Sequence, residues 1–139
     1  MDGASFGNPG PSGIGYVLVV GGRTIEEVSL DTGWGTNNQA EYRGLEAGLR
    51  AAKGHGVREL LVRSDSQLLV RQMTGEYKVK DPRLKLLKNE IDHLVAAFDR
   101  VDFEYVPREY NARADELAKA GATEAQLRGV RPAQETLPE

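Results

Sequence analysis

The stretch Gly13-Ile14-Gly15-Tyr16-Val17-Leu18-Val19-Val20-Gly21-Gly22 carries the clearest structural signal in this chain of 139 residues. Its β-branched and aromatic side chains favour a strand over residues 13–20. The two glycines that follow are typical of a two-residue hairpin turn, so residues 23–30 are predicted to return as a second strand. Residues 31–36, rich in glycine and threonine, are predicted to form a loop. The chain is therefore expected to begin with an antiparallel meander.

Helices and strands alternate after this meander. Asn37 or Asn38 is expected to cap a helix that stops at residues 54–56. The apolar residues 60–62 suit a strand that is buried on both faces, and a helix to about Met73 is expected to follow it.

Capping residues and apolar periodicity predict three more elements. Asp81-Pro82 suits the start of a helix, with apolar residues at helical spacing up to residue 98. Residues 101–105 alternate as a strand with one wet face does. Asn111 is expected to open a last helix that reaches about residue 127.

This order of elements predicts the α/β class, with one mixed sheet and helices packed on it. The length suits a single domain with a real hydrophobic core. The domain is expected to span residues 1–127. Residues 128–139 have few apolar side chains and are expected to form a loosely ordered tail.

The composition excludes several classes of protein. The chain has no cysteine, so it has no disulfide, no thiolate metal site and no cysteine nucleophile. No apolar run approaches the roughly 20 residues needed to span a membrane. The N-terminus has no basic segment followed by an apolar one. A cytoplasmic protein without a membrane partner is therefore the default expectation.

The formal net charge of -3 argues mildly against a nucleic-acid partner, because phosphate binding normally needs a basic surface. The charge is uneven along the chain, however. Between Arg71 and Lys88 there are six basic and two acidic residues, a local balance of +4. This segment is either a solvated, mixed-charge helix entry or a local basic surface.

Four acidic residues stand out by their positions. Glu41 heads an apolar stripe on its predicted helix, which is unusual for a glutamate. Asp65 directly follows an apolar strand, at the kind of strand end where α/β sheets bind ligands. Asp115 lies on a stripe of small residues, and Asp2 precedes a tight turn. Each has an ordinary alternative: a helix cap for Asp65, the helix dipole for Glu41, the surface for Asp115 and a frayed terminus for Asp2.

The segments around these acids resemble, in order, the signature segments of type 1 ribonuclease H. They are Asp2-Gly3-Ala4-Ser5-Phe6-Gly7-Asn8-Pro9-Gly10-Pro11, Thr36-Asn37-Asn38-Gln39-Ala40-Glu41-Tyr42, Ser64-Asp65-Ser66-Gln67 and Asn111-Ala112-Arg113-Ala114-Asp115-Glu116-Leu117-Ala118. The resemblance extends to about Ala122, which is nearly the whole chain. It implies a ribonuclease H-like fold, a five-stranded mixed sheet with helices on both faces. It also implies an endoribonuclease that hydrolyses the RNA strand of RNA–DNA hybrids, giving 5′-phosphate and 3′-hydroxyl ends.

The resemblance further implies that Asp2, Glu41, Asp65 and Asp115 are catalytic and bind metal ions. Two ionised carboxylates about 5 Å apart repel by roughly 3 kcal/mol at an effective dielectric constant of 20. Four together therefore need cations between them, or protons on some of them. Oxygen ligands without histidine or cysteine select Mg²⁺, with Mn²⁺ as a substitute. Two such ions about 3.5–4 Å apart would flank one phosphate in a two-metal-ion mechanism.

Substrate contacts follow from the same resemblance. Asn8, Asn38 and Gln67 match positions that read the minor groove and its 2′-hydroxyls, which distinguish RNA from DNA. Thr36 and Asn37 match positions near the DNA strand and its phosphate. Helix capping alone would also explain the two neighbouring asparagines.

The chain departs from the family pattern in three places. The loop before the last acid has no histidine, and Arg108 is expected either to take its role or to form only a surface ion pair. His55 and His93 match no catalytic position. The family's basic protrusion is missing, so hybrid binding is expected to use the short segment with Lys78 and Lys80. Relatives without the protrusion sometimes also cut double-stranded RNA, and that substrate stays open.

The third departure concerns the first strand, which looks truncated. In the family several strand residues precede the first acid, whereas here only Met1 does. Losing half of a central strand would leave unpaired backbone groups in a buried sheet. Either the start of the chain lies upstream or another segment covers the gap. If neither holds, Asp2 is poorly held and metal binding suffers.

Three functions remain open at this stage. The main prediction is a monomeric, metal-dependent nuclease for hybrids. The first alternative is a weak or inactive domain of the same fold that binds hybrids or double-stranded RNA. A change of substrate, as in the related integrases and junction resolvases, agrees less well with the matches at Asn8, Asn38 and Gln67.

Overall fold

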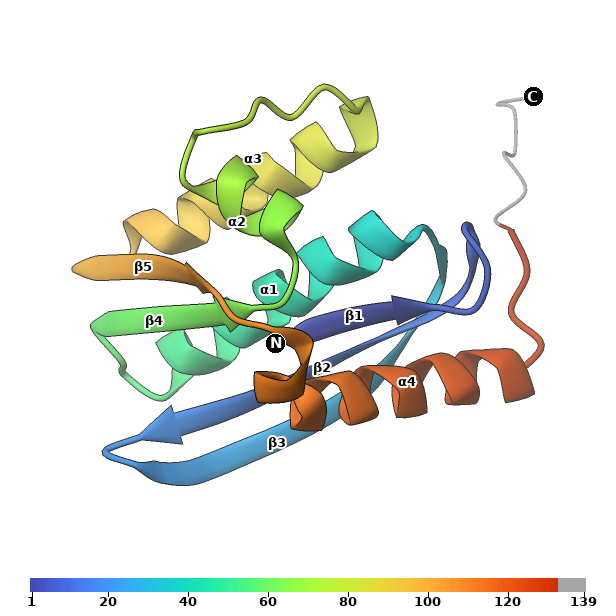
Figure 1. Cartoon of the computed structure of the whole chain (residues 1–139), viewed down its shortest axis with the longest axis horizontal. Coiled ribbons are helices and arrows are strands. Elements are labelled where there is room, and N and C mark those ends of the chain that lie inside the picture. The colour runs from blue at the N-terminus through green and yellow to red at the C-terminus, as the bar shows by residue number, and fades with distance from the viewer. Residues whose placement is uncertain (133–139) are drawn as a thin grey trace.

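The computed structural model describes residues 1–132, in which two groups of strands carry helices (Figure 1). Strands β1 (Asp2–Ser5), β2 (Gly10–Val20) and β3 (Arg23–Gly35) form an antiparallel sheet in that order. Strands β4 (Glu59–Ser64) and β5 (Arg100–Tyr105) form a parallel pair. The helical elements are α1 (Asn37–Gly54), α2 (Gln67–Met73), α3 (Pro82–Ala96), the 3₁₀ turn η1 (Arg108–Tyr110) and α4 (Ala112–Leu127).

Helices α1 and α4 cover opposite faces of the antiparallel sheet (Figure 1). Alternate residues of β2 serve the two helices, as the period of two in a strand requires. A Cβ at Gly13 would lie 2.2 Å from the backbone nitrogen of Ala122 in α4. A Cβ at Gly121 would lie 2.2 Å from the carbonyl oxygen of Leu30. Glycine on both surfaces therefore lets α4 rest directly on the sheet backbone, which brings its first turn to β1.

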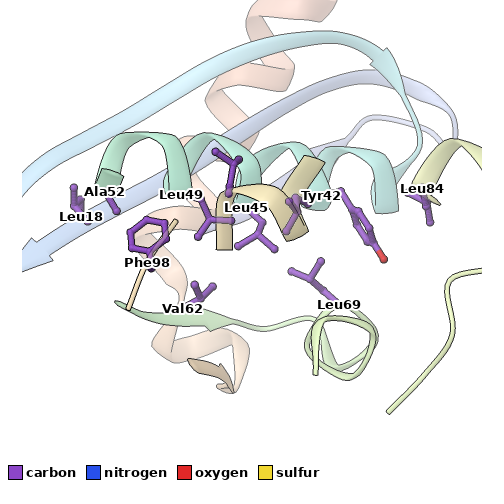
Figure 2. Close-up of a cluster of buried hydrophobic side chains, with 11 residues drawn as sticks. Leu18, Tyr42, Leu45, Leu49, Ala52, Val62, Leu69, Leu84 and Phe98 are labelled. Carbon is purple, nitrogen blue, oxygen red and sulfur yellow. The ribbon is translucent and has the colours of Figure 1, made fainter. Parts of the chain in front are cut away.

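The main core lies on the α1 side of the sheet (Figure 2). The predicted apolar stripe of α1 is confirmed, because Leu45, Leu49 and Ala52 are all buried. The stripe packs against buried side chains from β2, β4, α2, α3 and the turn after α3: Leu18, Val62, Leu69, Leu84, Ile91, Leu94 and Phe98. Glu41 lies four residues before Leu45 on α1, at the N-terminal end of this stripe, and is half-buried.

Several local predictions are confirmed. Gly21 and Gly22 join β2 to β3 with φ angles of 57° and 78°, which glycine adopts without strain. Asp81 caps α3 and accepts a hydrogen bond from the backbone nitrogen of Arg83, with Pro82 at the start of the helix. Asn111 precedes the last helix, as expected.

Two boundaries near the start of α1 were predicted wrongly. Residues 31–36 are not a loop, because β3 continues to Gly35 and pairs with the start of β2. The N-cap is Thr36 rather than either asparagine. Its side chain accepts a hydrogen bond from Gln39 N at 3.1 Å, and Gln39 Oε1 accepts one from Thr36 N at 2.9 Å. This reciprocal capping box satisfies two backbone donors at once.

The prediction that residues 60–62 are buried on both faces is wrong. Val62 is buried, but the side chain of Leu61 is 48% exposed. The reason is that α4 packs on β1, β2 and β3 and leaves the corresponding face of β4 open.

The two groups of strands are not joined by a continuous ladder. β1 pairs with β2 alone, and the Met1 ammonium group donates a hydrogen bond to Arg63 O, at the end of β4, at 3.2 Å. Beyond Met1, residues 16–20 of β2 and residues 59–63 of β4 line a groove of about 570 Å³. Residues 1–132 thus contain five strands, and helices cover both faces of the antiparallel sheet, as expected. The expected single sheet is divided because β1 has only four residues.

Two expectations concern the chain as a whole. Arg128, at the start of the predicted tail, forms an ion pair with Asp31 at 2.7 Å, and residues 133–139 of that tail lie outside the described residues. The boundary at residue 127 stays a prediction. Within residues 1–132, none of the helices combines the length and the apolar composition that crossing a membrane requires.

Candidate active site

Asp2 lies at the start of β1 and is buried, with 6% of its surface exposed. Its Oδ1 accepts a hydrogen bond from Gly3 N at 2.9 Å. A Cβ at Gly3 would lie 2.2 Å from the carbonyl carbon of Ala40 and 2.3 Å from the backbone nitrogen of Glu41. Only glycine at this position lets β1 touch α1, and this contact brings Asp2 and Glu41 together.

Glu41 is half-buried between β1 and the turn that follows β4. Burial raises the pKa of Glu41 to about 7, although a hydrogen bond with Ser66 opposes the shift and the charge of Asp65 adds to it. Ser66 is also the N-cap of α2, since its Oγ accepts a hydrogen bond from Leu69 N at 3.1 Å. The residue after Asp65 thus connects Glu41 to the start of α2.

Asp65 follows the last residue of β4 and is half-buried. Ser64 Oγ accepts a hydrogen bond from Ser66 N at 3.1 Å and so closes the turn around the aspartate. The charge of Asp65 raises the pKa of both Asp2 and Glu41. The strand end predicted as a ligand-binding position therefore lies near Asp2 and Glu41.

Asp115 lies in the first turn of α4. Burial acts to raise its pKa, but hydrogen bonds with Lys119 and Asp2 and the charges of Lys119 and Arg108 outweigh it and leave the pKa lowered. Lys119 Nζ lies 3.0 Å from Asp115 Oδ2. Asn111, just before α4, donates a hydrogen bond to Met1 O at 3.0 Å and ties the start of the helix to the start of β1.

The strongest electrostatic perturbation falls on Asp2. Its pKa is raised to about 8, first by burial, then by the charge of Asp65 and the hydrogen bond with Asp115, with a smaller contribution from Glu41. Because the pKa of Asp2 is raised and that of Asp115 is lowered, a protonated Asp2 is the expected donor in the hydrogen bond between these two carboxyl groups. The structure therefore brings all four predicted acids to one place.

The chemistry of this donor set suits a hard divalent cation. All four groups are carboxylates, and histidine and cysteine are absent from the cluster, which favours ions of the Mg²⁺ type. Burial and the charge of Asp65 together raise the pKa of Asp2, and a bound cation would favour the ionised form instead. Among residues 1–132 no three acidic or histidine side chains are yet spaced as a complete ion site. The acids influence one another through their charges and through the hydrogen bond between Asp2 and Asp115.

The predicted substrate contacts form two groups. Asn8, Thr36, Asn37 and Asn38 gather at the N-terminus of α1, where Asn8 Oδ1 accepts a hydrogen bond from Asn37 N at 3.0 Å. Gln67 is exposed at the first residue of α2, beside the turn that holds Asp65.

The remaining predicted residues are less closely tied to the acids. Lys78 and Lys80 are exposed on the segment between α2 and α3. Arg108 is exposed in η1, and its charge reaches Asp115. His55 lies elsewhere and bonds Glu26 at 2.7 Å, and His93 lies in the last turn of α3.

Sequence reasoning missed three polar residues that shape the site: Ser66, Asn111 and Lys119. Lys119 stands four residues after Asp115 on the same helix, a spacing that predicts an ion pair. Asn111 was predicted only to open the last helix, and Ser66 only as part of the segment from Ser64 to Gln67. The contact of Ser66 with Glu41 and that of Asn111 with the Met1 carbonyl join elements that are distant in the sequence. No local sequence pattern predicts such contacts.

Comparison with known proteins agrees with this fold. A family model described as "Reverse transcriptase-like" matches residues 1–121. Ribonuclease HI of Halobacterium salinarum is 44% identical over 126 residues, covering 90% of this chain and 63% of that protein. The N-terminal RNase H domain of Rv2228c from Mycobacterium tuberculosis, solved as a fusion with maltose-binding protein, superposes with a TM-score of 0.89 at 42% identity over 93% of this chain and 94% of that one. LC11-RNase H1 in complex with an RNA/DNA hybrid superposes with a TM-score of 0.84 at 43% identity, over 90% of this chain and 95% of that one.

These likenesses define the class as a ribonuclease H-like α/β protein with an acidic site. The chain belongs to the type 1 ribonuclease H family, whose enzymes use divalent metal ions. It spans 63% of the Halobacterium protein and 33% of the bifunctional mycobacterial protein Rv2228c.

Proposed function

We propose that this chain is an endoribonuclease that hydrolyses the RNA strand of RNA–DNA hybrids and leaves 5′-phosphate and 3′-hydroxyl ends. The observation that carries the proposal is a partly buried acidic cluster that gathers Asp2 from β1, Glu41 from α1, Asp65 from the turn after β4 and Asp115 from α4. A relative with 43% identity was solved with a hybrid bound, which supports the substrate class.

We propose that these four carboxylates hold two Mg²⁺ ions. Mn²⁺ can replace them. Bound divalent ions supply an activated water and stabilise the leaving oxygen in phosphodiester hydrolysis. The protein contributes the positions of the four carboxylates. To hold a cation, a protonated Asp2 would have to lose its proton, and the Asp115 carboxylate would have to leave Lys119.

Arg108 is proposed to take the place of the histidine that the loop lacks. The charge of Arg108 lowers the pKa of Asp115, so its guanidinium group lies near the last acid. It is exposed and so can reach a phosphate or a departing product. An arginine stays protonated, which suits a role in charge stabilisation better than one in proton removal.

Hybrid binding is proposed to use the two polar groups beside the acids. Asn8 and Asn38 near the start of α1, together with Gln67 at the start of α2, would read the 2′-hydroxyls of the RNA strand. Thr36 and Asn37 would lie near the DNA phosphate, where the backbone donors of a helix N-terminus favour an anion. Lys78 and Lys80 would add phosphate contacts farther along the hybrid.

The proposal is tested by incubating labelled RNA–DNA hybrid, double-stranded RNA and double-stranded DNA with the chain in Mg²⁺, Mn²⁺ or chelator. Cleavage of only the RNA strand of the hybrid is expected, with loss in chelator and in Asp65→Asn. Asp99→Asn is a matched control, because Asp99 is exposed at the opposite end of the β4–β5 pair. Metal-independent cleavage, or full activity in Asp65→Asn, would refute the proposal. Cleavage of double-stranded RNA would extend it.

A hybrid-binding domain with little or no cleavage is the second candidate. The observation that favours it is the junction of β1 with β4, where Met1 makes the backbone contact and a groove follows. If Asp2 and Asp65 do not bind ions together at this junction, the chain would bind hybrid without cleaving it at any Mg²⁺ or Mn²⁺ concentration. A monomer, a cytoplasmic location and a domain of residues 1–127 also remain predictions.

A further inference from the structure

The segment that joins α2 to α3, residues 74–81, is held in place at both ends. Thr74 Oγ1 donates hydrogen bonds to Val70 O at 3.0 Å and Arg71 O at 3.3 Å. Asp81 caps α3 at the far end. Between them, Val79 is half-buried against the hydrophobic core, whereas Lys78 and Lys80 on either side of it are exposed.

Arg71 binds Tyr77 through three separate contacts. Its guanidinium carbon lies 5.2 Å from the centre of the Tyr77 ring, within the range of a cation–π contact. Its Nη1 donates a hydrogen bond to Tyr77 Oη at 2.8 Å. Its carbonyl oxygen accepts a hydrogen bond from Tyr77 N at 3.0 Å. Both the backbone and the side chain of Tyr77 are therefore fixed to α2, immediately before Lys78.

The Arg71–Tyr77 pair lies on the same face of α2 as a proposed substrate contact. Gln67 and Arg71 are four residues apart in one helix, so their side chains are neighbours on its surface. Gln67 in turn follows the Asp65–Ser66 turn that meets Glu41. The face of α2 thus leads from the acidic cluster, through Gln67, to the clamped segment that carries the two lysines.

We propose that Arg71 is a positioning residue for hybrid binding, which clamps Tyr77 so that Lys78 and Lys80 are presented in a fixed arrangement to the phosphate backbone. This inference rests on the proposed function and adds to it. Ordering a free segment on binding costs conformational entropy, and a segment already held in place avoids that cost. The clamp supplies, in a chain without a basic protrusion, a rigid base for two phosphate-binding side chains.

Tyr77→Phe is the most specific variant, because it removes one hydrogen bond of the clamp and no charge. Tyr77→Phe and Arg71→Gln are each expected to raise the KM for hybrid by roughly three- to tenfold, with kcat unchanged at saturating hybrid. Limited trypsin digestion without nucleic acid should cut after Lys78 and Lys80 faster in Tyr77→Phe than in wild type. Arg58→Gln is the matched control. It removes an exposed arginine at the opposite end of β4, for which no ion pair is present within residues 1–132.

A double-mutant cycle tests whether Arg71 acts through the lysines. The increase in KM caused by Lys78→Gln with Lys80→Gln should be smaller in an Arg71→Gln background than in wild type, since the lysines there are no longer held in place. The salt dependence of hybrid binding, measured in an Asp65→Asn background, should be unchanged by Tyr77→Phe.

Three outcomes would overturn the inference. Wild-type KM and trypsin sensitivity in Tyr77→Phe would show that the clamp does not order the segment. A fall of about one in the salt-dependence slope for Arg71→Gln, with additive effects of the lysine variants, would make Arg71 itself a phosphate contact. Equal hybrid binding by wild type and all these variants would refute this inference and leave the proposed function intact. A wild-type protein that neither binds nor cuts hybrid would refute both.

Discussion

The two sides of strand β1 differ sharply in how they are joined to the rest of the molecule. On one side, all four residues pair with β2, and glycines let α1 and α4 approach the backbone directly. On the other side, the Met1 ammonium group makes a hydrogen bond to the end of β4, and a groove of about 570 Å³ follows. We call the side of β1 that pairs with β2 the firm side and the side that faces β4 the open side. Asp2, Glu41 and Asp115 belong to the firm side, whereas Asp65 belongs to the open side. The acidic cluster therefore spans the junction between β1 and β4, where no ladder joins the strands, and cations bound there would strengthen it.

The largest expected effect comes from breaking the firm side. Gly13→Val should lower the free energy of unfolding by about 3 kcal/mol or more, because a Cβ at this position meets backbone atoms of α4 at 2.2 Å. Thermal and urea unfolding would measure it. Gly48→Ala, in the interior of α1, is the control. Its Cβ would meet only Tyr16 Cβ at 3.9 Å, so it should stabilise by about 0.5–1 kcal/mol. Equal stability of Gly13→Val and wild type would contradict this view of the α4 contact.

The second effect comes from strengthening the open side. About five residues with alternating valine and isoleucine, added before Met1, should pair with the free edges of β2 and β4 and raise the free energy of unfolding by about 1–3 kcal/mol. An extension of equal length made of glycine and serine is the control. Cleavage activity should also rise, because the added strand would hold Asp2 against Asp65. No gain in stability or activity would show that the groove does not limit the protein.

A third prediction uses the raised pKa values of Asp2, about 8, and Glu41, about 7. Without metal, the folded state keeps protons that the unfolded state loses above pH 4, so stability should fall as the pH rises from about 4 to about 8. Asp2→Asn should flatten this fall and stabilise the metal-free protein at pH 8 by about 1 kcal/mol or more.

Mg²⁺ provides the second half of this test. It should raise the thermal midpoint of wild type at pH 8, and chelator should reverse the gain. Asp2→Asn should respond much less. A metal-free wild type whose stability is independent of pH between 4 and 8 would contradict the electrostatic account of the cluster.

The smallest effect is expected at Lys119, which lies 3.0 Å from Asp115. Lys119→Gln should lower the Mg²⁺ concentration for half-maximal cleavage by a factor of about two to five, because an ion pair with an exposed lysine contributes about 1 kcal/mol or less. Arg113→Gln is a control on the same helix, since Arg113 pairs with Glu27 and Glu116 instead. A higher Mg²⁺ requirement in Lys119→Gln would mean that the lysine assists the site rather than competing for it.

Much of the fold was predictable from local features. The Gly21-Gly22 hairpin, the Asp81-Pro82 helix start and the apolar stripe of α1 each depend on residues near in sequence, and each is confirmed. The four acids of the site were identified by their motifs, and the structure brings them together.

The errors share one physical origin, which is pairing between distant segments. Residues 31–35 form strand because they pair with the start of β2. Leu61 is exposed because α4 packs elsewhere. The contacts of Ser66 with Glu41 and of Asn111 with Met1 also join segments far apart in the chain. Such contacts depend on tertiary packing, which overrides local propensity.

The sequence by itself determined the order of the elements, most of their caps and the identity of the candidate metal ligands, because turn chemistry, side-chain periodicity and short motifs act over a few residues. Only the tertiary structure decided that burial and the neighbouring acids raise the pKa of Asp2, that the strands form two ladders, and that Arg71 contacts Tyr77 just before the two lysines. These features depend on burial and on distances between groups, and burial and distance exist only once the chain has folded.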